Sequence, residues 1–534
     1  MLLSVLWLLA ARAAPADGPD EAARPSAERF DEAIIDEAWP LVRVEVPDFP
    51  GALLSSAGAS LLAAPPTDGT PWRAEILAEP DLSPATPSEL AAWSTGSFRP
   101  GEAFDALGAG PYRAAGYDGS GVKVAVFDIQ WQDWELHAAE LGPVQTHDCA
   151  RHSSCARPID GVRPGFSFEY GSHGVACAEV IRDLAPGVEL HLVQVSGGVS
   201  LENAVSWAIR EQIDVVSMSL SFFGESFGDG TGPVNAQARR LRNNGVLLVT
   251  SAGNSATEHT RARFTDADGD SIHDGPDGGE RIAVELSPGT RRFNLHWDDF
   301  GRCETDLDAY VYAPSGALVG RGLATQDPED EACVPVERIA VYGQEEGIYD
   351  LVIHRKRGPA DVDLELFARG GLVVDGDPRG SIVDPGSSPT TLTVGAVNAS
   401  GYLANPVEYF SSWGPTAGGL NKPDLVGPDG LTGSVYGNLG FFGTSASTPA
   451  VAAAIALLLD ARPELSPVEA AALLRGHALS TAPVGAPHDP ARGAGAARLP
   501  PLDAQPLGCR AGRLFGIAAL LPILIPLRRR RAPR

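Results

Sequence analysis

The sequence predicts an α/β protein in which a parallel sheet flanked by helices is interrupted by an inserted antiparallel β-sandwich. Short apolar runs typical of strands buried on both faces alternate with helix-like stretches from Val122 to Asn254. After Asn254 the pattern changes to period-two strands separated by Gly, Pro and Asp turns, which indicates antiparallel sheets up to about Gly371. Strand and helix character resumes near residue 390, so the middle segment interrupts one α/β domain.

Five runs are predicted to form the parallel sheet, because each is short, apolar and rich in β-branched residues. Helix-like stretches separate the first four runs and would cover both faces of the sheet. The runs are VKVAVFD (122–128), VELHLVQV (188–195), IDVVSMSLS (213–221), GVLLVTSAGN (245–254) and TTLTVGAV (390–397).

The N-terminal part of the chain is predicted to contain a targeting segment and a spacer. Residues 1–13 have a short apolar core and end in Ala-Arg-Ala, which indicates a secretory signal peptide. A mis-set start codon and a buried apolar helix are the alternatives. Residues 14–105 are rich in Ala, Pro, Ser and acidic residues with weak periodicity, so we expect a propeptide or a spacer there.

The C-terminal segment, residues 498–534, joins Cys509 to an uncharged apolar stretch and then to an arginine cluster. As a helix, the stretch 514–527 would span about 21 Å, against about 30 Å of hydrocarbon, so a permanent span is marginal. The order of Cys, apolar stretch and Arg cluster resembles the C-terminal sorting tails of myxobacteria and their relatives. The resemblance implies export to the cell surface, outer membrane or extracellular space through a sorting machinery. A plain membrane anchor is the alternative.

The charge and the cysteines limit the class of protein. The net charge of −27 comes from 68 acidic and 41 basic residues, which argues against a nucleic-acid-binding surface. Six cysteines fit an exported protein. Cys149 and Cys155 bracket a short polar loop, and Cys303 and Cys333 fall in one later segment, so we pair them in this way as a hypothesis. Cys177 is expected to be a buried free thiol.

Three polar residues stand where a parallel sheet gathers its ligands. Asp128 closes a strand, His173 opens a helix, and Ser445 precedes an apolar helix. Loops at the carboxyl ends of parallel strands lie together, so the three side chains could converge. Nucleophilic hydrolysis needs a serine, a histidine that accepts its proton and a carboxylate that orients the histidine. Taken alone, Ser445 would be more simply explained as a helix cap.

Four motifs resemble those of the subtilisin-like serine peptidases. GTSASTPAVAAAIALLL is similar to their serine motif, GSHGVACAEVI to the histidine motif, VKVAVFD to the aspartate strand and VTSAGN to the oxyanion-hole segment. Their order along the chain, Asp, His, Ser, is that of subtilisin. The resemblance covers about residues 105–495. It implies a subtilisin-like domain formed by residues 106–262 and 372–497, with the β-sandwich inserted at 263–371.

The resemblance also implies roles for individual residues. Ser445 would be the nucleophile, His173 the general base and then acid, and Asp128 the carboxylate that orients His173. Asn254 would donate to the oxyanion beside the backbone N–H of Ser445. The implied protein is a monomeric endopeptidase that forms an acyl-enzyme on protein or peptide substrates and needs no catalytic cofactor. The strand expected to pair antiparallel with substrate contains Ser219, Leu220 and Ser221.

The sequence departs from the family pattern at Ala450, where a histidine is often found and where we expect little effect, and at two further places. Ile129 and Gln130 follow Asp128 where a small residue and glycine are usual, and Ser221 stands where glycine is usual. These departures leave open a catalytically inactive surface or binding protein on a subtilase fold. A nucleotide-binding protein is disfavoured, because the chain has no G-x-G-x-x-G between a strand and a helix and no P-loop.

An acidic turn opens the inserted segment and resembles an oxygen-rich calcium loop, with Gly269 permitting a tight turn. We expect structural calcium there, and a solvated acidic turn is the alternative. The nearby His259 and His273 are expected to be exposed loop residues rather than zinc ligands. The four expected calcium ligands are Asp266, Asp268, Asp270 and Asp274.

Overall fold

The computed structural model describes residues 101–503, except 160–171, 331–332, 344 and 481–487, and four short strands within residues 41–78. The predicted signal peptide, most of the predicted spacer, and the predicted tail from residue 504, with Cys509, lie outside the described residues.

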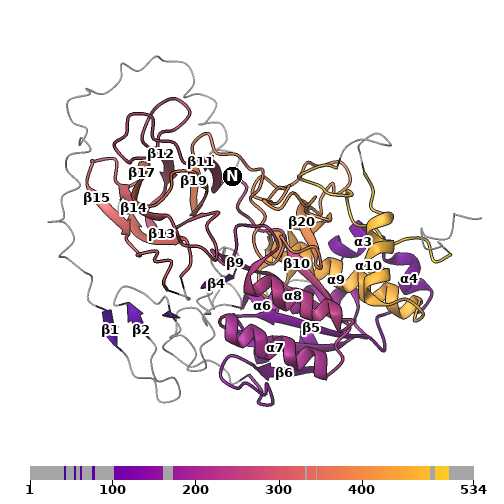
Figure 1. Cartoon of the computed structure of the whole chain (residues 1–534). Helices are drawn as coiled ribbons and strands as arrows, with labels where there is room; N and C mark the ends of the chain where they lie inside the picture. Colours follow the sequence, from indigo (N-terminus) through magenta and orange to yellow (C-terminus); the bar gives the residue numbers. More distant parts are fainter. Residues whose placement is uncertain are drawn as a thin grey trace, which may run out of the picture.

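Seven parallel strands form the central sheet, in the order β21-β20-β10-β8-β5-β7-β6 (Figure 1). The sequence predicted five of them. It missed the two edge strands, because one is half-exposed and polar and the other contains Gly and Pro. The strands are β5 (Lys123–Asp128), β6 (Val144–Asp148), β7 (Glu189–Gln194), β8 (Val215–Met218), β10 (Leu247–Ser251), β20 (Leu392–Asn398) and β21 (Leu425–Asp429).

Helices cover both faces of this sheet, and alternate residues of β5 mark the two faces. Val124 and Val126 pack in one apolar cluster with α6 (His173–Leu184) and α9 (Thr444–Ala461). Ala125 and Phe127 pack in a second cluster with α7 (Gly198–Arg210) and α8 (Gly232–Asn243). Smaller helices are α3 (Glu102–Leu107), α4 (Gly110–Ala114), α5 (Ala138–Leu141) and α10 (Pro467–Gly476).

Among the described residues, α9 is the helix long and apolar enough to cross a membrane. It is 89% buried inside the protein, which is the state of a core helix. Its alanine-rich sequence lets it pack closely against α6 and against the strands of the sheet.

The inserted segment is a β-sandwich of two antiparallel sheets, ordered β11-β18-β13-β16 and β15-β14-β17-β12-β19. Its apolar core includes Phe293 and Trp297. The strands begin at His259 and end at Val373, slightly outside the predicted bounds of 263–371. They are β11 (His259–Arg263), β12 (Ile282–Leu286), β13 (Gly289–Trp297), β14 (Asp306–Tyr312), β15 (Leu318–Gly322), β16 (Val336–Gly343), β17 (Gly347–Arg357), β18 (Asp363–Arg369) and β19 (Gly371–Val373).

A buried carboxylate organises the side of the sandwich that faces the α/β domain. Glu365 accepts hydrogen bonds from Arg261 Nε at 2.7 Å, His259 Nε2 at 3.1 Å and His296 Nε2 at 2.5 Å. The guanidinium of Arg261 also lies 5.5 Å from the ring centre of Phe227, a residue of the α/β domain. The sandwich therefore docks through a polar cluster flanked by aromatic contacts.

The expectation that His259 and His273 are exposed loop residues is wrong. His259 is fully buried on β11, where Nε2 of its ring is hydrogen-bonded to Glu365. His273 is buried beside Phe264, and its Nδ1 accepts the backbone N–H of Thr265.

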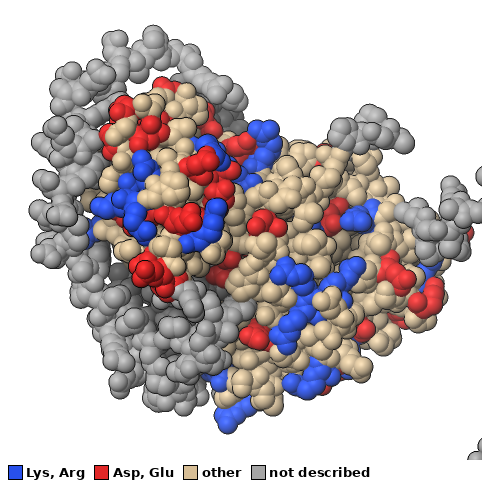
Figure 2. Space-filling model, in the orientation of Figure 1, with Lys and Arg blue, Asp and Glu red and all other residues tan. Residues whose placement is uncertain are grey.

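Both signs of charge are present on the face drawn in Figure 2. Acidic and basic side chains are interspersed over the sandwich, and basic side chains gather over the region of α7 and α8.

Short strands also form before the α/β domain. The strands β1 (Leu41–Arg43), β2 (Leu53–Ser55) and β3 (Leu61–Leu62) make a small antiparallel sheet. β4 (Glu75–Ala78) pairs antiparallel with β9 (Leu220–Phe223), the strand that follows β8 in the sequence. A segment of the predicted propeptide or spacer therefore lies on the strand predicted to bind substrate.

Candidate active site

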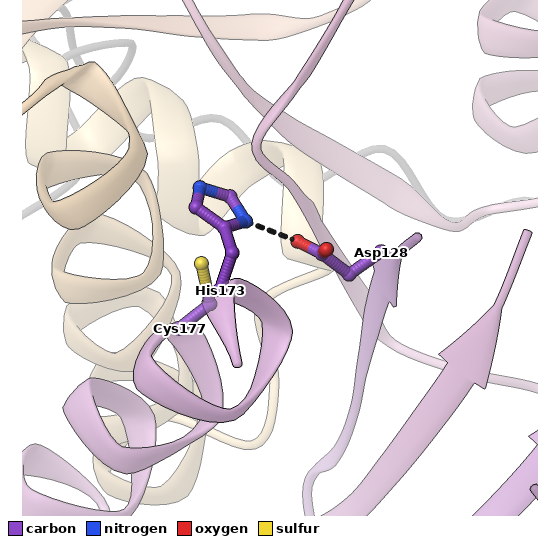
Figure 3. Close-up of side chains that lie close together, drawn as sticks. All are labelled: Asp128, His173 and Cys177. Atoms are coloured by element: carbon purple, nitrogen blue, oxygen red, sulfur yellow. Dashed lines mark hydrogen bonds and ion pairs between the residues drawn. The ribbon is translucent and has the colours of Figure 1, made fainter. Parts of the chain in front are cut away.

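A buried Asp–His pair stands at the carboxyl edge of the sheet. β5 ends at Asp128, α6 begins at His173, and Nδ1 of His173 lies 2.7 Å from Oδ2 of Asp128 (Figure 3). Asp128 is 0% exposed and His173 is 2% exposed. A buried carboxylate at this distance fixes the ring orientation and favours the proton on Nδ1.

Ile129 and Gln130, two of the residues that depart from the family pattern, help to hold the carboxylate. Oδ1 of Asp128 accepts the backbone N–H of Ile129 at 2.8 Å and that of Gln130 at 3.0 Å. The carbonyl of Gln130 in turn accepts the N–H of Gly174 at 3.0 Å. A Cβ at Gly174 would lie 2.7 Å from Cβ of Asp128, so glycine is required for this approach of α6 to β5. Backbone N–H groups, which every residue except proline supplies, therefore orient Asp128.

A thiol lies beneath the pair. Cys177, one turn after His173 on α6, is free and buried, and ligand atoms of Asp128, His173 and Cys177 fall within 4.8 Å of one another (Figure 3). Burial, reinforced by the Asp128 charge, raises the pKa of the Cys177 thiol well above its usual value. The neutral thiol is a poor metal ligand, since metals bind the thiolate.

Ser445 begins the central helix close to this pair. The residue is 2% exposed in the first turn of α9, and its hydroxyl has no hydrogen-bond partner among the described residues. Its carbonyl oxygen accepts the hydroxyl of Ser219 at 3.0 Å and lies 3.6 Å from Sγ of Cys177. Ser445 is therefore packed between the helix that carries His173 and the predicted substrate strand.

Asn254 lies beside the turn that leads to Ser445. Its Oδ1 accepts the backbone N–H of Thr444 at 3.0 Å and the Thr444 hydroxyl at 2.9 Å. The backbone N–H of Thr444 needs an acceptor, so the side-chain atom of Asn254 that faces it must be the oxygen. The side-chain amide nitrogen of Asn254 therefore points away from Thr444. That nitrogen would be 3.2 Å from a Cβ at Gly443, so a side chain at Gly443 would crowd the site.

The predicted substrate strand is buried and paired. Leu220 and Ser221 are almost fully buried, and β4 supplies their partners, with Leu77 opposite Ser221. The edge of β9 is therefore paired, in the antiparallel direction, with an extended segment of the same chain.

The acidic turn of the sandwich is only partly assembled as expected. Carboxylates of Asp266, Asp268 and Asp270 lie within 4.8 Å of one another, and Arg355 pairs with Asp266 at 3.1 Å. The carboxylate of Asp274 instead accepts the backbone N–H of Ala267 at 2.6 Å.

Sequence reasoning missed a further carboxylate beside this turn, Glu280. Burial, and then the charges of Asp270, Asp268 and Asp274, raise the pKa of Glu280. Excess negative charge of this kind suits a hard cation.

Both predicted cysteine pairs are bonded in the structure. Cys149 and Cys155 have an S–S distance of 2.06 Å, and Cys303 and Cys333 one of 2.08 Å.

A second missed residue, Glu179, joins three segments around the site. It lies on α6, and its Oε1 accepts the hydroxyl of Ser434, in the hairpin formed by β22 (Leu431–Gly433) and β23 (Gly437–Phe441). The same oxygen lies 3.2 Å from Nδ1 of His137, in the 3₁₀ helix η4 (Trp134–His137). A glutamate on an apolar helix was the available signal, but its partners are remote in sequence.

A third missed residue is Asp429, the last residue of β21. Its Oδ2 accepts the backbone N–H of Gly443 at 3.0 Å, so it contacts the turn before Ser445.

The chain is similar to a known protein family over two separate segments. The model of the Subtilase family matches residues 152–285 and 365–497, which together make up half of the chain. The gap between the two segments falls inside the β-sandwich, and Asp128 lies before the first segment.

Similar proteins include serine protease AprX of Bacillus subtilis (strain 168), 31% identical over 150 residues that cover 23% of this chain and 34% of that protein. Subtilisin-like protease SBT3.16 of Arabidopsis thaliana is 31% identical over 194 residues, 35% of this chain and 22% of that protein. The chain thus spans about a third or less of the length of these relatives. Among solved structures, the CspB protease of Clostridium perfringens has a TM-score of 0.49 at 14% identity and covers 74% of this chain and 97% of that one.

A parallel α/β sheet that presents a buried Asp–His pair and a serine at the start of its central helix defines the subtilisin class of proteins. The chain belongs to the Subtilase family.

Proposed function

We propose that the protein is an exported or surface-attached serine endopeptidase that hydrolyses peptide bonds through Asp128, His173 and Ser445. The observation that carries the proposal is the buried 2.7 Å contact between His173 and Asp128 beside the start of α9. A buried Asp–His pair next to a helix-terminal serine is the arrangement that turns a weak hydroxyl into a nucleophile.

The reaction begins when Oγ of Ser445 attacks the carbonyl carbon of the scissile bond and its proton passes to Nε2 of His173. Asp128 accepts from Nδ1–H and stabilises the imidazolium. The oxyanion of the tetrahedral intermediate receives hydrogen bonds from the Asn254 amide and the Ser445 N–H at the positive end of α9.

Collapse of the intermediate breaks the C–N bond. The leaving amine takes the proton from His173, and the acyl group stays on Ser445. A water molecule then attacks the acyl carbon while His173 accepts its proton, and a second collapse returns that proton to Ser445 and releases the carboxylic acid. His173 therefore accepts a proton in each attack step and donates it in each collapse step.

The substrate would bind as an extended chain along β9. The antiparallel pairing of β4 with Leu220–Phe223 supports this part of the proposal, because an extended segment of the chain pairs with the same strand edge. Ser221 places a hydroxymethyl group at this edge, so we expect a narrowed pocket for the side chain next to the scissile bond.

Export is supported by the two disulfides, since such bonds persist in oxidising compartments. We propose that residues 1–13 direct secretion and that Cys509 with the arginine tail serves sorting or anchoring. For structural calcium, Asp266, Asp268 and Asp270 are the residues that would bind the ion.

The alternative is a subtilase-fold binding protein without activity. Labelling of the mature chain with a fluorophosphonate, beside a Ser445→Ala variant, distinguishes the two. The peptidase proposal expects labelling of the wild type alone. A folded, processed wild type that stays unlabelled would favour the binding protein.

A further inference from the structure

The carboxyl group of Asp429 is buried next to the turn that carries Ser445. Asp429 ends β21 and is 0% exposed. Its Oδ2 accepts the N–H of Gly443 at 3.0 Å, and its Oδ1 has no hydrogen-bond partner among the described residues. A fully buried carboxyl group is costly unless it satisfies another group, so its contact with Gly443 requires an explanation.

That contact belongs to a pair of anchors on the turn. Asp429 accepts the N–H of Gly443, and Asn254 accepts the N–H of the next residue, Thr444. The following N–H along the chain is that of Ser445, the proposed oxyanion donor. One anchor is the last residue of β21 and the other lies in the segment that follows β10, and these two strands flank β20 on opposite sides. Together they fix the first turn of α9 to the sheet, which a local cap within the turn could not do.

The turn needs such anchors because its backbone conformation is unusual. Gly443 has φ 116° and ψ 162°, a region that is open to glycine and strongly disfavoured for other residues. A glycine that is free to leave this conformation would let the Ser445 hydroxyl and N–H rotate together, since both follow it on the same turn.

We propose that Asp429 is a positioning residue for the Ser445 turn: by accepting the Gly443 N–H it holds the Ser445 hydroxyl and N–H in the geometry for attack and oxyanion binding. This inference rests on the proposed peptidase function. It assigns the role to the acceptor oxygen and not to the negative charge, because a neutral carboxyl or amide oxygen can accept the same N–H.

The surroundings agree with a role that does not need charge. Burial is the main cause that raises the pKa of Asp429 to about 7, Gly443 N–H lowers it, and the charge of Glu408 raises it further. Near neutral pH both protonation forms are therefore present, and each keeps an oxygen on Gly443.

The test compares Asp429→Asn, which keeps an acceptor, with Asp429→Ala, which removes it. Glu337→Ala is the matched control, since Glu337 is a carboxyl of similar burial within the sandwich. For each variant we would measure the second-order rate of fluorophosphonate labelling, kcat and KM on a peptide amide, and unfolding by urea.

We expect Asp429→Ala to lose about 10- to 100-fold in labelling rate and kcat, because small displacements of a nucleophile cost factors of this size, with KM within about threefold. Asp429→Asn and Glu337→Ala should stay within about threefold of the wild type in labelling rate. This pattern would separate positioning from general destabilisation.

Three results would overturn the proposal: a folded Asp429→Ala that labels like the wild type, a folded Asp429→Asn as slow as Asp429→Ala, or an equal loss in Glu337→Ala. If Asp429→Ala does not fold, Asp429→Ser replaces it, because its hydroxyl is one bond shorter and falls short of Gly443. A wild type that does not label, beside an unlabelled Ser445→Ala, would instead overturn the proposed function, and this inference with it.

Discussion

Nδ1 of His173 lies 2.7 Å from Oδ2 of Asp128, and the other oxygen of that carboxylate is held by two backbone N–H groups. The carboxylate therefore cannot rotate away from the ring without losing three hydrogen bonds. This relationship is fixed by the ends of β5 and α6 and does not depend on the side chains at positions 129 and 130.

Asp128→Asn should lower kcat by about 10⁴-fold, because the amide favours the wrong tautomer of His173 while the geometry stays intact. The measurement is steady-state kinetics on a chromogenic peptide. Gln130→Ala is the control, since it keeps the backbone N–H that donates to Asp128, and it should remain within about threefold of the wild type. A large loss in Gln130→Ala would mean that the departure from the family pattern has a role of its own.

Asn254→Ala should lower kcat by about 10²- to 10³-fold with little change in KM, the loss known for the equivalent amide of subtilisin. Asn254→Asp separates the two functions of the side chain, because it keeps an acceptor for Thr444 but has no amide donor. It should be at least as slow as the alanine variant. Activity near the wild-type level in Asn254→Asp would contradict an oxyanion role.

Asp429→Asn should change how stability depends on pH. An aspartate has a pKa near 4 when unfolded, whereas burial raises the pKa of Asp429 to about 7. The folded wild type thus binds the extra proton between these values, and its stability falls relative to the variant as pH rises from about 4 to 7. The relative loss is at most about 4 kcal/mol and levels off above pH 7.

Urea unfolding from pH 4 to 8 measures this difference, with Ser445→Ala in both proteins to prevent self-digestion. Parallel stability curves for the two proteins would show that Asp429 titrates normally and is not buried as described.

Calcium should raise the Tm if the acidic turn of the sandwich binds it. At 100 times the Kd the ion adds about 2.7 kcal/mol, which corresponds to several degrees in a protein of this size. Asp268→Asn should abolish the rise, whereas Asp277→Asn, an exposed residue of the same loop, should preserve it. Calorimetry with calcium or chelator is the measurement, and an equal rise in both variants would place the ion elsewhere.

Much of the architecture could be predicted because its strands and helices produce local hydrophobic patterns in the sequence. Strands such as β5 and β10 are continuous apolar runs, and helix α9 is an apolar stretch after a Gly-Thr-Ser turn. The position of Asp128 follows from the strand that it ends, and the position of Ser445 follows from the helix in whose first turn it lies. The strands β6 and β21 were missed because edge position tolerates polar residues and proline, which removes the apolar signal.

The sequence by itself determined the α/β class and the motif residues, and it led to the hypothesis that pairs Cys149 with Cys155 and Cys303 with Cys333, which the structure bears out. Only the tertiary structure decided that His259 is buried against Glu365, that Glu179 reaches Ser434, and that Asp429 anchors Gly443. These contacts join residues from 14 to 255 positions apart, and no local period encodes them. They exist because folding packs distant segments against one another, and a buried polar group must find its hydrogen-bond partner among the groups that packing brings near it.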